Sequence, residues 1–192
     1  TIPKGETTPM RHRLTPYSRA LRLTLGAVLA AGVLGTGTVS AQTAAPTALT
    51  AVKAPDGKDL GTITLTQYPH GVLLRGELRG LKPGPHAIHI HANGTCAPDF
   101  AAAGGHFNPG SGKHGLVESP IHAGDLPNIV ADADGKAAVE IITHLVNLGD
   151  GADSVFKTGG TSIIVHAGPD DYSSQPAGNS GDRVGCGVIT KS

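Results

Sequence analysis

Six of the ten histidines in this chain lie in one stretch, from Gly84 to Asp125. The same stretch contains Cys96, one of the two cysteines, and ends on the carboxylate of Asp125. Imidazole is the commonest metal ligand among side chains, and a carboxylate can complete a zinc site. We therefore interpret the stretch as the larger part of a two-metal centre; the alternative is a histidine-rich surface loop. The six histidines are His86, His89, His91, His106, His114 and His122.

A first ligand set begins with two histidines in one predicted strand, residues 85–91. His89 and His91 stand two positions apart, so their side chains point to the same side of a strand and can chelate one metal. The pair alone is a weak signal, because two exposed strand histidines would show the same pattern. His166, at the end of another apolar run, can supply a third donor, and His106 is the nearest loop histidine for a fourth.

A second set lies in the loop rich in glycine and proline that follows this strand. Its members are His106, His114, His122 and Asp125. Three imidazoles and one carboxylate make a closed four-coordinate site, which suits tetrahedral zinc. Scattered, solvated histidines are the alternative. His106 stands in both sets, and an imidazole has two ring nitrogens with which to bridge two metals; composition and spacing permit this bridge without establishing it.

The elements that must position these residues are predicted to be strands. Short runs rich in Val, Ile, Leu and Thr are separated by Gly, Pro, Asn and Asp, which is typical of an antiparallel sandwich or barrel. Asp134-Gly135 is a strong hairpin signal between two of the runs. Residues 147–156 are expected to hold at most one helical turn. The eight predicted strands are residues 50–53, 60–68, 72–79, 85–91, 129–133, 137–142, 162–166 and 187–190.

The N-terminal part of the chain is expected to lie outside this domain. Residues 1–41 combine four early arginines, an apolar run over 23–39 and the small-x-small sequence Val39-Ser40-Ala41, which together indicate a secretory signal peptide. An uncleaved anchor helix is the alternative. Met10 is the only methionine, which leaves open that residues 1–9 precede the true start. Residues 42–49 are expected to be a flexible leader, and residues 50–192 the single folded domain.

Export would place the chain in an oxidising compartment, periplasmic or otherwise extracytoplasmic. In such a compartment disulfides persist, which favours a bond between Cys96 and Cys186. After Ala41, seven lysines and three arginines stand against fourteen acidic residues, a net charge of −4. This acidic balance argues against a nucleic-acid partner, and no membrane span is expected once the signal is removed.

Five motifs, in the same order, resemble those of copper–zinc superoxide dismutases of the exported bacterial type. The resemblance covers about residue 50 to the C-terminus. The motifs are GPHAIHIH from Gly84, GGHFNPGSGKHG from Gly104, IHAGDLPN from Ile121, VHAGPDDY from Val165 and GNSGDRVGCGVI from Gly178.

This resemblance implies an eight-stranded antiparallel Greek-key β-barrel with long metal-binding loops. Each subunit is then expected to bind one copper and one zinc, bridged by His106. The resemblance also implies the Cys96–Cys186 disulfide, an Asp170 that orients one histidine of each metal, and a structural role for His86. The implied copper ligands are His89, His91, His106 and His166, and the implied zinc ligands are His106, His114, His122 and Asp125.

The implied activity is the dismutation of superoxide to oxygen and hydrogen peroxide, an antioxidant defence outside the cytoplasm. His106 is expected to carry a proton to the product, and Arg183 to lie over the open face of copper and attract the anion. The structural alternative for Arg183 is a surface ion pair with Asp182 or Asp171. Superoxide is the expected partner, and a homodimer is left open.

Two departures from the family pattern affect this interpretation. Ile88 stands where the family commonly has Phe, which concerns packing, and the segment after His166 has no lysine to help steer an anion. A copper/zinc storage or delivery module and an inert member without turnover are the alternative functions. No metal role is expected for the three remaining histidines, His12, His70 and His144.

Overall fold

The computed structural model describes residues 45–118 and 120–192, so the expected signal peptide lies outside the described residues. Within these ranges the chain forms ten strands and one short 3-10 helix, η1 (Phe100–Ala103). No helix of this part is both long and apolar enough to cross a membrane. The strands are β1 (Thr47–Lys53), β2 (Asp59–Tyr68), β3 (Gly71–Leu78), β4 (Gly84–His86), β5 (Ile88–His91), β6 (Ile129–Ala131), β7 (Ala137–Thr143), β8 (Ser162–His166), β9 (Arg183–Val188) and β10 (Thr190–Lys191).

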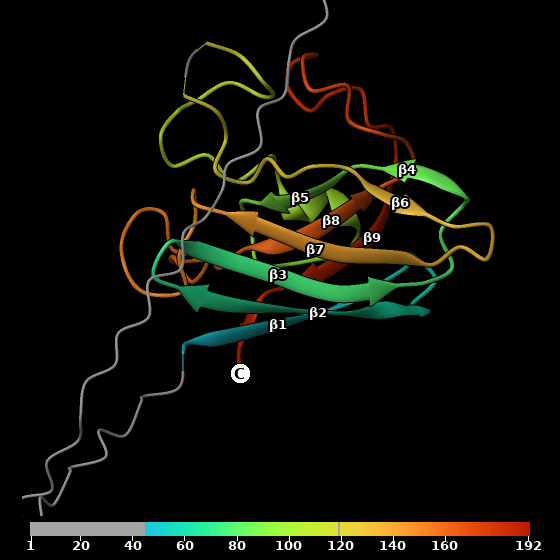
Figure 1. The fold of residues 1–192 in the computed structure, drawn as a ribbon, viewed down its shortest axis with the longest axis horizontal. Coiled ribbons are helices and arrows are strands. Elements are labelled where there is room, and N and C mark those ends of the chain that lie inside the picture. The colour runs from blue at the N-terminus through green and yellow to red at the C-terminus, as the bar shows by residue number, and fades with distance from the viewer. Residues whose placement is uncertain (1–44, 119) are drawn as a thin grey trace, which may run out of the picture. The chain divides into compact units, whose positions relative to one another are not determined.

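All ten strands belong to one antiparallel sheet that curls almost closed into a barrel. Nine of them follow the order β4-β6-β7-β3-β2-β1-β9-β8-β5, and β10 pairs with β1. The two ends of this order, β4 and β5, are consecutive in the chain and separated only by Ala87. The sheet therefore returns to its own starting edge (Figure 1), and the all-β, antiparallel barrel expected from the sequence is confirmed.

Alternating burial along the strands builds the core inside this barrel. In β7, for example, Ala137, Val139 and Ile141 are buried and the residues between them are exposed. Burying one such aliphatic side chain contributes about 1.5–3 kcal/mol. The centre of the core is formed by Ile63, Leu65, Leu74, Ile88, Ile90, Ile163 and Val165.

Strands β5 and β8 differ from the others because every residue in both is buried. Their inward side chains, such as Ile90 and Ile163, join the core, while His89, His91 and His166 are buried outside that apolar cluster. Isolated bridges join β5 to the long loop between β5 and β6. Figure 1 shows this loop and the loop between β8 and β9 on the side of the barrel away from β1 and β2.

The strand boundaries differ from the predicted ones at three places. The predicted strand 85–91 is interrupted at Ala87, whose N–H donates to Gly168 O and whose carbonyl accepts from His166 N, both at 2.9 Å. This corner divides it into β4 and β5 and raises the strand number above eight. The first strand begins at Thr47 and not at residue 50, so residues 47–49 belong to the sheet and not to a leader.

The third difference is in the last predicted strand, 187–190, which covers the end of β9 and the start of β10 with Ile189 between them, whereas β9 itself begins at Arg183. Gly185 and Gly187 lack the side chains whose alternation would indicate the full length of β9. A Cβ at Gly185 would lie 3.0 Å from Val52 Cγ1, and one at Gly187 would lie 2.3 Å from Thr50 Oγ1, so the close approach of β1 excludes larger side chains there. Residues 147–156, where at most one helical turn was expected, hold none and form turns and a bridge between Asn147 and Ser154.

Candidate metal centre

Strand β5 is the element that assembles the site. His89 and His91 lie on one of its faces, and β8 pairs beside it, with His89 opposite Ile164. On the other side, the loop between β5 and β6 returns to the same strand through two isolated bridges. These place His106 opposite His91 and Asp125 opposite His89. The long loop thereby brings its ligand candidates to β5 and β8, the two strands that carry His89, His91 and His166.

The first group consists of four buried imidazoles. One ring nitrogen of each belongs to a set whose atoms all lie within 4.8 Å of one another. Within the described residues these four nitrogens have no hydrogen-bond partner: His89 Nδ1, His91 Nε2, His106 Nε2 and His166 Nε2. A buried polar atom without a partner is costly, so converging unpaired nitrogens indicate a bound cation. An all-nitrogen donor set suits copper.

The opposite nitrogen of each ring sets its orientation. His91 Nδ1–H donates to Gly104 O at 2.9 Å, and His166 Nδ1–H donates to Gly181 O at 3.2 Å. These bonds leave Nε2 of each ring bare toward the centre. Burial lowers the pKa of His91 to about 2 and that of His166 to about 4, so both rings are neutral, as metal ligands must be.

The second group contains three imidazoles and one carboxylate, again within 4.8 Å of one another. Asp125 Oδ1 lies 2.7 Å from His106 Nδ1, 3.1 Å from His114 Nδ1 and 3.3 Å from His122 Nδ1. Burial by itself would raise the pKa of Asp125, but bonds from His106 and the Gly115 amide together lower it to about 2. The group therefore offers an ionised oxygen and three nitrogens, a donor set that suits zinc.

His106 takes part in both groups through different atoms. Its Nδ1 faces Asp125, and its Nε2 belongs to the four unpaired nitrogens. Its ring centroid lies 4.0 Å from that of His89 and 5.3 Å from that of His122. The two nitrogens of His106 therefore face the two groups separately.

Asp170 connects the two groups a second time. Its two carboxylate oxygens accept from His89 Nε2 and from His114 Nε2, each at 2.9 Å. Burial would raise the pKa of Asp170, but these two bonds hold it well below its usual range. A buried carboxylate that orients one ring of each group is the arrangement by which outer residues tune metal ligands.

His86 lies outside both groups, as expected. Its Nδ1 contacts His166 O and its Nε2 contacts Lys82 O, both at 2.7 Å. Because the partners are main-chain carbonyls, His86 ties the end of β8 to the segment before β4. Its role is structural.

Arg183 projects from the start of β9, opposite His166 in the sheet register. Its guanidinium donates to Phe100 O at 2.6 Å and to Gly104 O at 2.7 Å. In the described part of the chain it forms no ion pair within 4.0 Å, so the alternative pairing with Asp182 or Asp171 is wrong. Burial lowers its pKa and the charge of Asp99 opposes that shift.

The Cys96–Cys186 disulfide is present and joins the segment before η1 to β9. Cys186 packs with Ala103 and Ile164 in a small cluster apart from the main core, with Phe100 beside it. The bond thereby fixes η1, whose Phe100 carbonyl holds Arg183.

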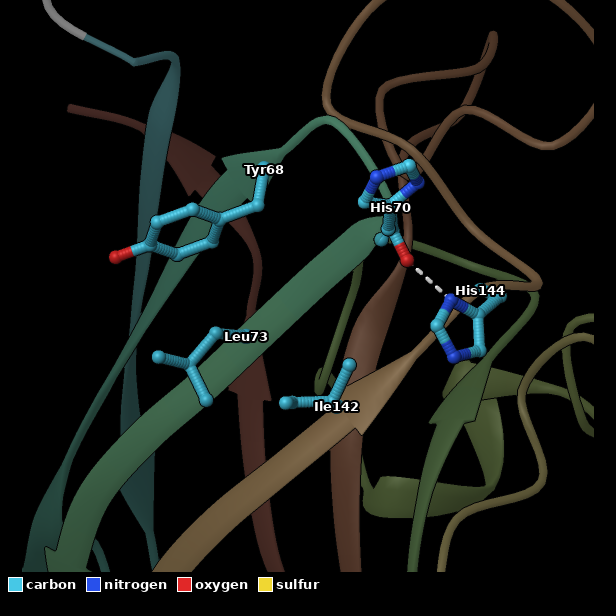
Figure 2. A pocket seen from close by; sticks show the side chains of 6 residues that line it. Tyr68, His70, Leu73, Ile142 and His144 are labelled. Atoms are coloured by element: carbon cyan, nitrogen blue, oxygen red, sulfur yellow. Dashed lines mark hydrogen bonds between the residues drawn. The ribbon is translucent and has the colours of Figure 1, made fainter. Parts of the chain in front are cut away.

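Of the hollows in the described part of the chain, one borders His166, a second borders Arg183 and a third lies elsewhere. His166 and residues 175–181 line a hollow of about 190 Å³, and Arg183 lines another of about 320 Å³ with the disulfide segment. Figure 2 shows the third, apolar hollow, in which His144 donates through Nδ1 to the carbonyl of His70. His70 and His144 belong to neither metal group.

Residues that sequence reasoning missed tie the two long loops together. Asn128 exchanges two bonds with the main chain of Asp170, at 2.8 and 2.9 Å, and the Tyr172 hydroxyl accepts from Asn128 N. Gln175 bonds to the main chain of His114. Asn128 and Tyr172 end two of the motifs that carry the family resemblance, but their residue types indicated no role there, and Gln175 lies outside all five motifs.

Comparisons with known proteins agree with this geometry. The family model described as copper/zinc superoxide dismutase (SODC) matches residues 60–189. The Cu-Zn superoxide dismutase of Caulobacter vibrioides is 51% identical over 143 residues, 72% of this chain and 82% of that protein. That of Deinococcus radiodurans is 42% identical over 147 residues, 69% and 78% of the two chains.

Solved structures with the same fold are similar as well. The Cu/Zn superoxide dismutase from Brucella abortus superposes with a TM-score of 0.63 at 32% identity, covering 75% of this chain and 99% of that one. A SOD-like protein from Bacillus subtilis has a TM-score of 0.70 at 34% identity, with 73% and 96% covered.

Proposed function

The chain belongs to the copper/zinc superoxide dismutase family, and we propose how its own residues divide the two metals. It is an oxidoreductase that dismutes superoxide to oxygen and hydrogen peroxide, with copper and zinc as cofactors. The copper ligands in this proposal are His89, His91, His106 and His166. The zinc ligands are His106, His114, His122 and Asp125.

One observation carries the assignment. Four buried ring nitrogens without partners converge on one point, and one of these rings, His106, presents its other nitrogen to three further donors. The softer all-nitrogen set suits copper, and the set with a carboxylate suits zinc. With both cations bound, the two groups use eight donor places with seven side chains, because His106 serves both.

The chemistry divides between the metals and the side chains. When bound, copper supplies two accessible oxidation states, whereas zinc supplies none. His106 Nε2 is placed to hold a proton and deliver it to the reduced substrate, while its Nδ1 stays beside Asp125. Asp170 keeps the His89 and His114 rings in their orientations while the proton is held and delivered.

Arg183 is proposed to attract and orient the superoxide anion. Its charge is held beside the centre by two main-chain carbonyls and is not neutralised by a paired acid among the described residues. The loop between β8 and β9 contains no lysine, and the mature segment is acidic. Attraction of the anion therefore depends strongly on this one guanidinium.

Assay of the mature protein after loading with both metals tests the proposal against a storage module. The expected result is rapid removal of superoxide with one copper and one zinc per chain. Two bound metals without turnover would indicate storage or delivery, and failure to bind copper would indicate an inert member. The presence of every expected ligand in the two groups argues against the inert member.

We also propose that the protein acts outside the cytoplasm, in the periplasm or as a secreted protein. The signal-like pattern of residues 1–41 and the disulfide support this, because disulfides persist in oxidising compartments. Fractionation of producing cells, with the N-terminus of the extracytoplasmic product sequenced, tests it; the expected first residue is Gln42. A homodimer stays a prediction, which light scattering of the purified protein tests.

A further inference from the structure

The side-chain amide of Gln175 forms hydrogen bonds with both the N–H and the carbonyl oxygen of His114. His114 N–H donates to Gln175 Oε1 at 3.0 Å, and Gln175 Nε2 donates to His114 O at 2.8 Å. The two residues are 61 positions apart in the chain. A paired contact of this kind fixes both the position and the direction of the His114 backbone.

His114 needs such support because its loop has little structure of its own. It belongs to the segment NPGSGKHG, rich in glycine and outside any strand. Within the described residues, Gln175 provides the only hydrogen bonds to the main chain of His114. The next supports lie on the two neighbouring residues. Lys113 N–H donates to Pro120 O at 2.9 Å and Lys113 O accepts from His122 N at 3.1 Å, and Gly115 N–H donates to Asp125 Oδ2 at 2.9 Å.

The backbone position decides where both ring nitrogens of His114 point. Its Nδ1 faces Asp125 at 3.1 Å, and its Nε2 faces Asp170 at 2.9 Å. With Cα held by Gln175 and the ring held at both ends, His114 has one orientation. Without the amide, the His114 main chain loses both of its own hydrogen bonds and can shift between its anchored neighbours, moving the ring with it.

Gln175 also lies at the approach to the other group. It lines the hollow of about 190 Å³ together with His166 and Asn179. One side chain therefore joins the loop that carries His114 to the loop that borders His166. Asn179 differs, because it bonds only within its own loop, to Asp171 and Ser174.

We propose that Gln175 is a positioning residue for zinc, which holds His114 in its ligating orientation and couples zinc binding to the order of the loop beside His166. This inference rests on the proposed assignment of His114 to zinc. It follows that zinc binding orders residues 173–181 partly through the Gln175 amide.

Zinc affinity of the mature, metal-free, disulfide-intact protein tests the inference through competition with a chelator of known affinity. Loss of an outer partner of a metal ligand typically costs about 10–100-fold in affinity, and we expect Gln175→Ala to weaken zinc binding within that range. Gln175→Glu keeps the shape but replaces the donor to His114 O by an acceptor, so it should weaken zinc as well. Unfolding curves establish that each variant is folded.

Asn179→Gly is the matched control. Asn179 has φ of 51°, which glycine adopts without strain, so the change removes a side chain from the same hollow without disturbing the backbone. Its zinc affinity should stay within threefold of the wild type. Hydrogen exchange of residues 173–181 should slow on addition of zinc in the wild type and in Asn179→Gly, and slow less in Gln175→Ala.

The outcomes separate this inference from the ligand assignment. If His114→Ala removes zinc but Gln175→Ala binds it within threefold of wild type, the positioning role is wrong and the assignment stands. If Asn179→Gly weakens zinc as much as Gln175→Ala, general loosening of the loop is the cause and the inference is overturned. If His114→Ala keeps wild-type zinc affinity, the assignment itself fails and the inference fails with it.

Discussion

His91 and Arg183 donate to one shared acceptor, the main-chain carbonyl oxygen of Gly104. His91 Nδ1 lies 2.9 Å and Arg183 Nη2 lies 2.7 Å from this oxygen. The guanidinium is therefore located relative to a proposed copper ligand through a single carbonyl. The carbonyl that orients the imidazole, together with that of Phe100, also fixes the distance at which the positive charge lies from the centre.

This arrangement predicts a catalytic defect without loss of metal in Arg183→Ala. We expect kcat/KM to fall by about tenfold or more, equivalent to about 1.4 kcal/mol or more of lost stabilisation. Wild-type rates should fall as salt rises, because salt screens the attraction between separated charges. The variant should show a flatter or reversed salt dependence, since the remaining field of the acidic chain repels an anion.

Arg183→Lys is the control for charge alone. A lysine retains the positive charge but cannot hold both carbonyls in one planar fork, so an intermediate rate is expected. Rates should be compared at equal copper occupancy. Equal rates for wild type and Arg183→Ala at low ionic strength would remove Arg183 from the mechanism.

His106→Ala tests the bridge between the two groups. We expect a folded protein with weakened binding at both sites and little activity, because one side chain supplies a donor to each group. His122→Ala is the comparison, since it belongs to the zinc group alone and should leave copper binding closer to wild type. Elemental analysis after dialysis measures both metals. A His106→Ala protein with two tightly bound metals and full activity would contradict the bridge.

Reduction of the Cys96–Cys186 bond should destabilise the protein substantially. The cysteines are 90 positions apart, and a loop of that length is worth about 4–5 kcal/mol on the chain-entropy estimate. For a domain of this size we expect Tm to fall by roughly 10 °C. Activity should fall as well, because η1 supplies the Phe100 carbonyl that holds Arg183.

A Cys96→Ser, Cys186→Ser variant should reproduce the effect of reduction without added reductant. Calorimetry at matched metal content measures the change in Tm. An unchanged Tm in both the reduced protein and the double variant would show that the bond contributes no stability. Free thiols in protein recovered from outside the cytoplasm would show that the bond does not form in the cell.

The metal-free protein should lose stability as the pH falls from about 6.5. In the folded chain the pKa of His166 is lowered to about 4, against an ordinary value of 6.5. Between these values the unfolded chain binds more protons than the folded chain, so acidification favours unfolding. His91, whose pKa is lowered to about 2, acts in the same direction over a wider range.

Urea unfolding of the metal-free protein between pH 6.5 and pH 4.5 measures this dependence. His166→Gln, which cannot take up the proton, should show a shallower loss of stability over the same range. Asp125 contributes only at lower pH, because its pKa is lowered from 3.8 to about 2 and its stabilisation is lost between those values. A free energy of unfolding that is constant between pH 6.5 and pH 4.5 would contradict the prediction.

Much of the centre could be predicted from local spacing. His89 and His91 share a strand face because side chains alternate with a period of two, and the structure confirms that face. The loop histidines, His166 and the cysteine pair were also predictable, because their residue types restrict them to few chemistries. Most strands followed from short apolar runs between turn residues. The start of β9 did not, because Gly185 lacks a side chain to continue the alternation where β1 approaches closely.

Other features were decided only by tertiary structure. The nitrogen that each histidine turns toward the centre depends on what its other nitrogen meets: Gly104 O for His91, Gly181 O for His166 and Asp170 for His89. The position of Arg183 depends on carbonyls 83 and 79 residues away. No sequence pattern indicated a role for Gln175, because its contact with His114 forms only when the two long loops pack together.

The physical reason is the same in each case. Spacing along a chain reports which residues share a face of one element, and so it indicated the candidate ligand sets, while the resemblance of five motifs implied the family. Main-chain carbonyls and amides are alike at every position, so a sequence does not show which of them a side chain will meet. Closure of the barrel and of its two long loops selects those partners, and through them the orientation of each ring and the location of the charge.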